Sequence, residues 1–409
     1  MHRTVLTMAF FMALPGLVST ASADDHDWPQ YRGIHRDGVS PEAGLLSSWP
    51  ADGLAEIWRL PIGQGFSCLI VADGQVFTML AEGEEDTFKE YAAAFDADTG
   101  KKRWQVELGD MFVDEFGNGP RSSPTISDGV AYAFGSYGHL LALQTTDGAI
   151  LWEMDIPKQF ATQTPRWGFS TSPLIEDGML FIEAGGGEGK AFAALDKKTG
   201  QVLWTALDGG AGYGSPIAVS LDGQRQFVAV LNDKVVSLDA KGTKLWEHPW
   251  SEQTMTIAMP LFVAPDKFFI SASGNGGTMM IQMDPQGEAR SAKELWRNRS
   301  MKNHFSSSVV RDGYIYGFDN ATLKCLAVPS GELAWARRGF GKGSLILADH
   351  RLLILSDRGR LVLAEASPSA FQEVSGFQAL DGKCWTSPTL SHGRIFLRNH
   401  AEMACYQAR

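Results

Sequence analysis

Tryptophan recurs along this chain at nearly regular intervals, and this periodicity limits the possible folds more than any other feature. Seven tryptophans follow one another at spacings of 46, 48, 52, 42, 50 and 39 residues: Trp58, Trp104, Trp152, Trp204, Trp246, Trp296 and Trp335. Five have a glycine four residues earlier: Gly100, Gly148, Gly200, Gly242 and Gly331. A period of about 40–50 residues is typical of propellers, in which each repeat packs against its neighbours.

Each repeat has the pattern of two strands joined by a tight turn. One full unit begins with the apolar residues Ala194 and Leu195, continues through Asp196 to Gly200, and ends at Trp204. Asp, Thr and Gly favour a turn, because glycine adopts positive φ without a steric penalty. The tryptophan that ends the second strand is large enough to pack between neighbouring sheets.

A second pattern alternates with the first and predicts the inner hairpins. It consists of Ser-Pro, an apolar strand, Asp-Gly and another apolar strand, as in the segment from Ser123 to Tyr132. Asp-Gly between apolar runs is a strong hairpin signal. Variants of the pattern occur eight times, beginning near Ser67, Ser123, Ser172, Ser215, Met259, Ser307, Ser344 and Ser387.

The two patterns together predict an all-β, eight-bladed β-propeller with four-stranded antiparallel blades. The last hairpin, Thr386 to Arg409, lacks an outer strand, and the segment Leu54–Leu60 supplies a spare one. We therefore expect this N-terminal strand to complete the last blade by pairing with Ala401–Tyr406, which removes an open sheet edge. Blade seven has no tryptophan, and Phe377 is the predicted substitute. Blade five carries an insertion, 285–294.

The chain begins with the features of an exported protein. An apolar run from Val5 to Val18, followed by Ala21-Ser22-Ala23, predicts a signal peptide over 1–23 with cleavage near Ala23. An N-terminal arm, 24–53, and the propeller, 54–409, follow. The run is too short to span a bilayer, so we expect a periplasmic or secreted protein without a transmembrane anchor. The net charge of −11 disfavours nucleic acid as a partner.

Four cysteines in an oxidising compartment raise the question of a disulfide. Cys325 and Cys405 occupy small apolar positions of their repeats, so we expect buried thiols there. Cys68 and Cys384 both fall near the start of inner strands in neighbouring repeats, and the sequence leaves a bridge between them open. No cysteine or histidine spacing matches a metal site.

The repeated Ala-x-Asp-x-x-Thr-Gly-x-x-x-Trp unit resembles the PQQ-like (pyrroloquinoline quinone) repeat family over about Leu54 to Arg409. One branch of that family is the quinoprotein dehydrogenases, which bind PQQ and calcium. The other consists of non-catalytic propellers similar to the outer-membrane assembly lipoprotein BamB. The segment from Trp28 to Gly38 and on to Trp49 looks like the lead-in of PQQ-like propellers.

The second branch is the better match in size and ring closure. The dehydrogenases imply a plate of adjacent cysteines and a Glu, Asn and Asp set for calcium, and neither can be placed here. We therefore expect a non-catalytic scaffold, a monomer that binds a protein partner and needs no cofactor. The alternatives are a PQQ-dependent oxidoreductase and a protein that binds a small anion or a carbohydrate.

Residues just before each inner strand are the candidate site, because the starts of these strands meet at one mouth of the channel. The candidate ligand-binding residues are Arg121, Arg166, Trp167, Tyr213, His304, Lys342, Lys383 and Trp385. Phe66, Phe169, Lys302, Phe305 and Phe340 occupy similar positions. Cations and aromatic rings at one mouth suit a flat or anionic ligand, with the two arginines able to hold a carboxylate.

A structural explanation of the same residues stays open. Aromatic side chains beside Gly and Ser often pack between blades, and loop lysines are often solvated. Asp110, Asp114 and Glu115 also crowd one loop, where calcium is an alternative to simple solvation, but their spacing is not that of an EF-hand. We expect no catalytic residue.

Overall fold

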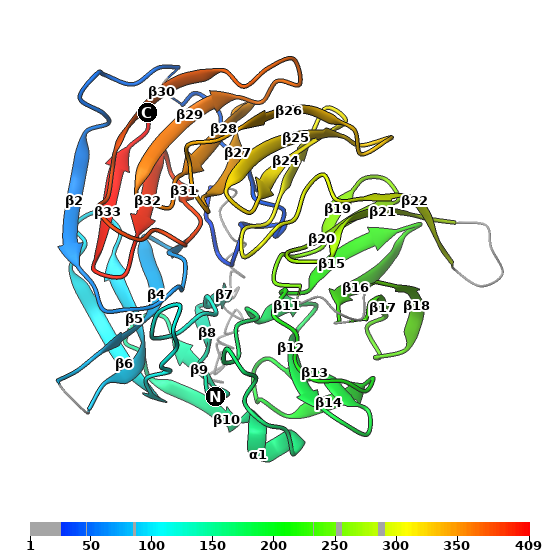
Figure 1. Ribbon diagram of the computed structural model, residues 1–409. Coiled ribbons are helices and arrows are strands. Elements are labelled where there is room, and N and C mark those ends of the chain that lie inside the picture. The colour runs from blue at the N-terminus through cyan, green and yellow to red at the C-terminus, as the bar shows by residue number, and fades with distance from the viewer. Residues whose placement is uncertain (1–25, 46, 85–86, 232, 251–255, 285–290) are drawn as a thin grey trace, which may run out of the picture.

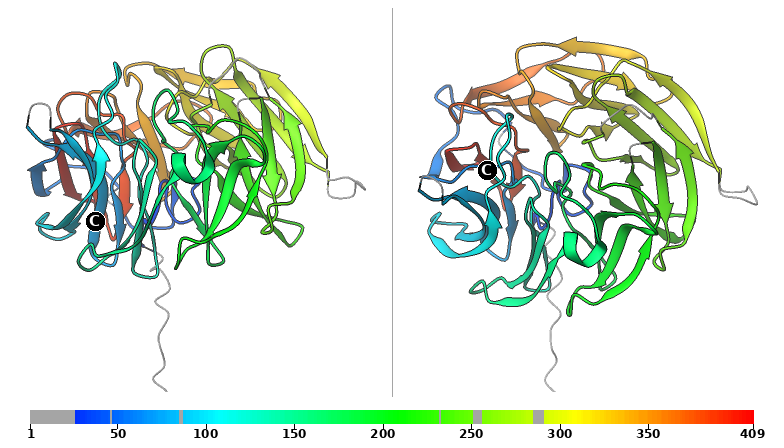
Figure 2. Two further views of the ribbon diagram at one scale, coloured as in Figure 1. Left: turned by 90° about the horizontal axis from the view of Figure 1, so that it is seen from below. Right: turned by 60° about the horizontal axis from the view of Figure 1, so that its bottom comes forward.

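The computed structural model describes residues 26–45, 47–84, 87–231, 233–250, 256–284 and 291–409. The predicted signal peptide, 1–23, lies outside these residues, as do residues 285–290 of the predicted insertion. In the described part, eight sheets stand around a central channel, which confirms the predicted eight-bladed propeller (Figure 1). Figure 2 shows the same ring from two further sides.

Each blade has four antiparallel strands that run outward from the channel. From blade one to blade eight, the inner strands are β3 (Ile70–Ala72), β7 (Thr125–Ser127), β11 (Leu174–Glu176), β15 (Ile217–Leu221), β19 (Leu261–Val263), β23 (Val309–Arg311), β27 (Ser344–Ala348) and β31 (Thr389–Ser391). The second strands are β4 (Gln75–Glu82), β8 (Val130–Phe134), β12 (Met179–Gly186), β16 (Gln224–Val230), β20 (Lys267–Ala272), β24 (Tyr314–Asp319), β28 (Arg351–Leu355) and β32 (Arg394–Arg398).

The outer half of each blade carries the tryptophan repeat. The third strands are β5 (Lys89–Asp96), β9 (His139–Gln144), β13 (Lys190–Asp196), β17 (Lys234–Leu238), β21 (Gly277–Met283), β25 (Thr322–Ala327), β29 (Arg360–Glu365) and β33 (Glu402–Gln407). The outermost strands are β6 (Lys102–Asp110), β10 (Ile150–Asp155), β14 (Val202–Ala206), β18 (Lys244–Pro249), β22 (Ala292–Asn298), β26 (Leu333–Arg337), β30 (Glu373–Gln378) and β2 (Glu56–Pro61).

The eighth blade is built from both ends of the chain, as predicted. Strand β2 pairs with β33, and Trp58 lies opposite Cys405. The inner hairpins also have the expected turns: Asp128 and Gly129 take φ values of 51° and 74°, which are typical of the two-residue turn that Asp-Gly favours.

A short helix, α1 (Ile156–Phe160), leads from blade two toward blade three. Its N-cap is Asp155, whose side chain accepts a bond from the Lys158 backbone N–H at 3.0 Å. None of the helices that the structure describes is long and apolar enough to cross a bilayer.

The repeated tryptophans dock each blade onto the next one. The Trp104 Nε1–H donates to the Thr145 carbonyl at 2.8 Å, and Trp152 donates to Lys197 at 3.0 Å. Corresponding bonds to the next blade join Trp58 to Ala97, Trp204 to Ala240, Trp296 to Val328 and Trp335 to Ser367. Trp246 instead donates to Gln226 within its own blade. Four rings are buried (Trp58, Trp104, Trp246 and Trp335), while Trp152, Trp204 and Trp296 are half-buried.

The remaining structural predictions have clear outcomes. Phe377 contacts Tyr406 of blade eight, with ring centres 5.3 Å apart, so it takes the docking place of the missing tryptophan. All four cysteines are buried free thiols, so Cys68 and Cys384 form no disulfide. Asp110 and Asp114 pair with Lys89 and Arg121, at 2.6 and 3.4 Å.

The N-terminal arm fills the channel, a role that the sequence did not reveal (Figure 1, dark blue). Its backbone pairs with blade one through Trp28 and Val71. Its strand β1 (Val39–Ser40) runs parallel to the inner strand β27 of blade seven. The buried Arg32 donates to the carbonyls of Ser307 and Ser308 in blade six.

The arm also contacts blade three and blade eight. Arg36 is buried and donates to the carbonyls of Ser172 and Pro173, at 2.9 and 2.8 Å. The Glu42 carboxylate accepts from Gly393 N–H and from Arg409, both at 2.7 Å. Arg36 has no carboxylate partner among the described residues, and burial lowers its pKa to about 9.

Candidate functional site

A ring of serine hydroxyls holds the starts of the inner strands together. The Cys68 N–H donates to Ser123 Oγ, the Ser123 N–H to Ser172 Oγ, and the Ser172 N–H to Ser215 Oγ, each at 2.9 Å. Met259 N–H donates to Ser307 Oγ in the same way. The hydroxyls of Ser123, Ser172, Ser215 and Ser307 therefore each join their own blade to the previous one. The sequence marked these serines only as strand starts, although their recurrence was a signal for this role.

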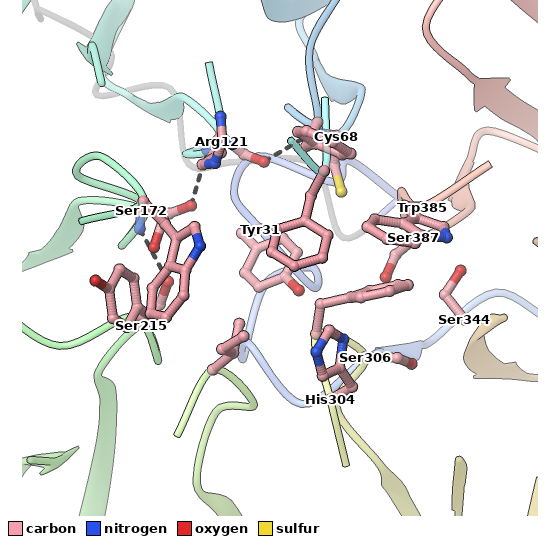
Figure 3. Close-up of a pocket in the computed structure, with 18 of the residues that line it drawn as sticks. Tyr31, Cys68, Arg121, Ser172, Ser215, His304, Ser306, Ser344, Trp385 and Ser387 are labelled. Atoms are coloured by element: carbon pink, nitrogen blue, oxygen red, sulfur yellow. Dashed lines mark hydrogen bonds between the residues drawn. The ribbon is translucent and has the colours of Figure 1, made fainter. Parts of the chain in front are cut away.

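A cavity of about 220 Å³ lies above this ring (Figure 3). Its floor includes Tyr31 from the arm, and burial raises the pKa of that phenol to about 12. The lining is rich in aromatic side chains from several blades: Phe66, Phe116, Trp167, Tyr213, Phe305 and Trp385. The ring centres of Phe305 and Trp385 lie 4.8 Å apart, and those of Trp167 and Tyr213 lie 5.4 Å apart.

The structure brings most of the predicted site residues to this cavity. Five of the eight line it: Arg121, Trp167, Tyr213, His304 and Trp385. The two lysines lie at its rim, since Lys342 Nζ is 5.6 Å and Lys383 Nζ 3.6 Å from the centre of the Trp385 ring. Arg166 is exposed and stacks its guanidinium 5.1 Å from the Trp167 ring centre. Arg166, Lys342 and Lys383 are hereafter called the rim cations.

Arg121 is less free than the sequence suggested. Its guanidinium donates to the carbonyls of Gly119 and Gly117, at 2.9 and 3.0 Å, and lies 3.4 Å from Asp114. It also stacks 4.7 Å from the Phe112 ring centre. Arg121 therefore holds the loop beside the cavity, and N–H groups on both of its terminal nitrogens are already bonded.

His304 carries no positive charge at neutral pH. Burial, together with the nearby charge of Lys342, lowers the His304 pKa to about 4. His400, which packs edge-on against Phe66, has a pKa lowered to about 4, first by burial and then by nearby cations. Both imidazoles are neutral at pH 7, and His304 forms a polar, uncharged part of the cavity lining.

Three further residues near the strand starts do not face the cavity. Phe169 packs on Phe134, and Phe340 on Phe318, with ring centres 5.0 and 6.4 Å apart. These two phenylalanines therefore pack between blades, which is the structural role that the sequence left open as an alternative. Lys302 lies 3.7 Å from Asp319, and that contact satisfies its charge.

Several polar atoms at the cavity have no hydrogen-bond partner in the described structure. They are Trp167 Nε1, Ser170 Oγ, His304 Nδ1 and Ser306 Oγ, and all four are buried. These residues line the cavity. Because a buried polar group without a partner costs free energy, the cavity suits a ligand that offers hydrogen bonds to its wall.

Comparison with known proteins supports a family assignment. A family model described as outer membrane protein assembly factor BamB matches residues 89–337. A protein of that name from Yersinia pestis is 25% identical over 200 residues, 48% of this chain and 46% of the relative. One from Shewanella oneidensis is 23% identical over 276 residues, 63% and 66% of the two chains. The alignments thus span about half to two thirds of these relatives.

Solved structures share the propeller. The quinohemoprotein alcohol dehydrogenase of Comamonas testosteroni superposes with a TM-score of 0.64 at 13% identity, covering 93% of this chain and 80% of the enzyme. BamB of Moraxella catarrhalis superposes with a TM-score of 0.59 at 13% identity, covering 87% and 99%. These two likenesses show the fold alone, whereas the family model covers more than half of the sequence. The chain therefore belongs to the PQQ-like propeller family described as outer membrane protein assembly factor BamB.

Proposed function

We propose that this protein is a non-catalytic, extracytoplasmic scaffold that binds a protein partner during outer membrane protein assembly. The names of its family and of its relatives support a role in outer membrane protein assembly. The observation that carries the binding role is a group of exposed apolar side chains beside the cavity. Val113, Phe116 and Tyr137 are 67%, 44% and 47% exposed, and such a group is typical of an interaction surface.

The filled channel supports the same proposal. Because the arm occupies the centre of the ring, the mouth with its cavity offers a partner a concave surface rather than an open channel. We further propose that the chain works outside the cytoplasm, after removal of the signal peptide near Ala23. The proposed partner therefore meets the protein in the periplasm or beyond it.

The described residues do not fit a calcium-dependent quinone site. No three His, Cys, Asp or Glu side chains in the described ranges come close enough together to hold a metal ion. At the cavity, Asp114 is paired with Arg121, and Cys68 is a lone buried thiol without a neighbouring cysteine. This disagreement supports the proposal of a protein without PQQ or calcium.

Turnover assays test this part of the proposal. We expect the purified chain to oxidise neither alcohols nor sugars with an artificial electron acceptor, even after addition of PQQ and calcium. A dye-reduction assay, with a known quinoprotein as positive control, measures this. Activity that depends on the added cofactor would support an oxidoreductase instead.

A second candidate function is the binding of a small anion or a carbohydrate. The aromatic lining and the size of the cavity favour it, since stacked rings and a few polar groups are typical of small-molecule sites. This candidate does not use the exposed side chains of Val113 and Tyr137, which lie outside the cavity lining.

Deletion of the gene in its native host tests the proposed function. We expect the mutant to contain less folded outer membrane protein, measured by heat-dependent mobility on gels, and a plasmid copy of the chain to restore the amount. Unchanged amounts and unchanged folding in the mutant would contradict a role in assembly.

A further inference from the structure

The rim cations have no acidic partner in the part of the chain that the structure describes. Among the described residues, no carboxylate lies within 4.0 Å of the charged groups of Arg166, Lys342 or Lys383. Instead, these groups stack on Trp167 and Trp385, and Lys383 also donates to the Phe116 carbonyl. In a chain with a net charge of −11, three cations without carboxylate partners at one mouth are a local positive site.

The positive charges at this mouth also repel one another. The pKa of Lys383 is lowered, first by burial and then by the charges of Lys342 and Arg121. The neighbouring imidazoles of His304 and His400 are neutral, so they add no further charge. An anionic partner would offset this repulsion at the rim, which lies beside the indole of Trp385.

The apolar surface continues from the cavity onto the outside of the molecule. Phe116 lines the cavity and is also exposed, and Val113 precedes it in the same loop. Tyr137, from the next blade, packs on Phe112 with ring centres 5.4 Å apart. Val113, Phe116 and Tyr137 together are called the apolar ridge. A ligand that covers both cavity and ridge must be longer than one ring.

The loop that carries the ridge is held in place by hydrogen bonds. Phe116 N–H donates to the Asp114 carboxylate at 2.8 Å, and Gly119 N–H donates to the Phe112 carbonyl at 2.8 Å. Arg121 adds its two bonds to the carbonyls of Gly117 and Gly119. The ridge is therefore a preformed surface, which lowers the entropic cost of binding.

We propose that this mouth binds an acidic peptide segment of a partner protein, with one aromatic side chain in the cavity and carboxylates on the rim cations. The unpaired polar atoms of Trp167, Ser170, His304 and Ser306 would bond the polar groups of that segment. The apolar ridge would pack against the residues that follow the aromatic one. The inference rests on the proposed function, because it describes how the scaffold holds its partner.

Selection of peptides on the intact protein tests the ligand class before the partner is identified. Random short peptides displayed on phage are selected on the full mature chain. We expect the enriched peptides to combine an aromatic residue with Asp or Glu. The absence of enrichment, or enrichment of basic or purely aliphatic peptides, would overturn the proposal.

Matched variants then locate the site. The enriched peptide, labelled with a fluorophore, is titrated against a triple variant with Arg166→Gln, Lys342→Gln and Lys383→Gln. We expect about tenfold weaker binding and a smaller dependence on salt, because the rim charges are gone. Lys101→Gln with Lys198→Gln and Lys241→Gln removes three exposed charges elsewhere and should leave the affinity unchanged. Equal losses in both triple variants would overturn the rim assignment.

A second matched pair of variants tests the apolar ridge. Phe116→Ala should weaken the same peptide about tenfold, since its ring contributes to both cavity and ridge. Leu203→Ala is the control, because Leu203 is 48% exposed on the outer strand β14 and lies outside the cavity lining. Identical affinities of these two variants would contradict a peptide that covers the ridge.

Two further measurements separate this inference from its alternatives. If phenylacetate competes with the peptide at equal affinity, the site takes a small aromatic acid and the peptide proposal fails. In the deletion strain, the triple rim variant combined with Phe116→Ala should fail to restore outer membrane protein. Full restoration by that variant would overturn the inference and leave the proposed function standing, whereas a deletion without effect would overturn the proposed function itself.

Discussion

The charged side chains buried inside the blades differ in how well their charge is satisfied. Glu90 is buried, and its two carboxylate oxygens accept from the N–H groups of Phe112 and Ser136. Glu183 is equally buried, but it accepts one bond, from Gly212 N–H at 2.8 Å, and its other oxygen has no partner in the described structure. Burial raises the pKa of Glu183 to about 8, so this side chain is largely protonated at neutral pH.

Glu183 therefore makes stability depend on pH. The unfolded chain releases this proton near pH 4.3, about the value of a free glutamate, whereas the folded chain holds it to about pH 8. The contribution of Glu183 to the free energy of unfolding is complete below its pKa in the unfolded chain. It is lost as the pH rises to its pKa in the folded chain. Between pH 5 and 8, the melting temperature should fall more steeply in the wild type than in Glu183→Gln. The exposed Glu332→Gln should keep the wild-type slope, and parallel curves for all three would contradict the assignment.

At the scale of the blade, the glycine of the repeat leaves space for the tryptophan ring of the previous blade. A Cβ on Gly148 would lie 2.9 Å from the Trp104 ring, and one on Gly200 would lie 2.8 Å from Trp152. Gly100, Gly242 and Gly331 lie against Trp58, Trp204 and Trp296 in the same way. The constant spacing of Gly and Trp within one repeat therefore reflects contacts between two successive blades.

This arrangement predicts different costs for two glycine substitutions. Gly148 and Gly178 have similar φ values, +77° and +81°, so alanine strains the backbone at both. Only Gly148 has a ring in the way, whereas a Cβ on Gly178 meets no atom within 4 Å. Gly148→Ala should therefore lose about 1–3 kcal/mol more of the free energy of unfolding than Gly178→Ala. Chemical denaturation measures both, and equal losses would contradict the packing role.

The repeats made the architecture predictable, because each strand, turn and docking ring is a local pattern. The ring closure by Leu54–Leu60 followed from counting strands, and the pairing of Trp58 with Cys405 confirms it. The site was predictable only in part, since position before an inner strand does not tell where a side chain points. Phe169 and Phe340 pack at the blade interfaces, and Arg121 donates hydrogen bonds to its own loop. Burial, which makes His304 neutral, is a property of the assembled ring.

At the scale of the whole molecule, the arm connects blades that are far apart in the sequence. It pairs with blade one at Val71 and with blade seven at Leu347, and it bonds blade three through Arg36 and blade six through Arg32. The sequence showed the arm only as a segment that looks like the lead-in of PQQ-like propellers. Its contacts could not be predicted, because Arg32 meets carbonyls 275 and 276 residues away.

If the arm is part of the fold, a substitution there should weaken the entire ring. Trp28 is 2% exposed and belongs to a buried apolar cluster that extends from blade seven to blade two. Trp28→Ala should lower the free energy of unfolding by about 3–5 kcal/mol, with one cooperative transition. Calorimetry measures the transition, and limited proteolysis reports on the arm. Release of the arm by protease without a change in melting temperature would show that the arm is an appendage.

The proposed binding surface for a protein partner in the envelope is the mouth of this plugged propeller. A photo-crosslinking amino acid placed at position 116, in the full chain and in its native host, tests this most directly. We predict a crosslinked product that mass spectrometry identifies as an outer membrane protein or a component of its assembly, and that is absent when the same group is placed at position 203. No product at 116, or the same products from both positions, would contradict the account.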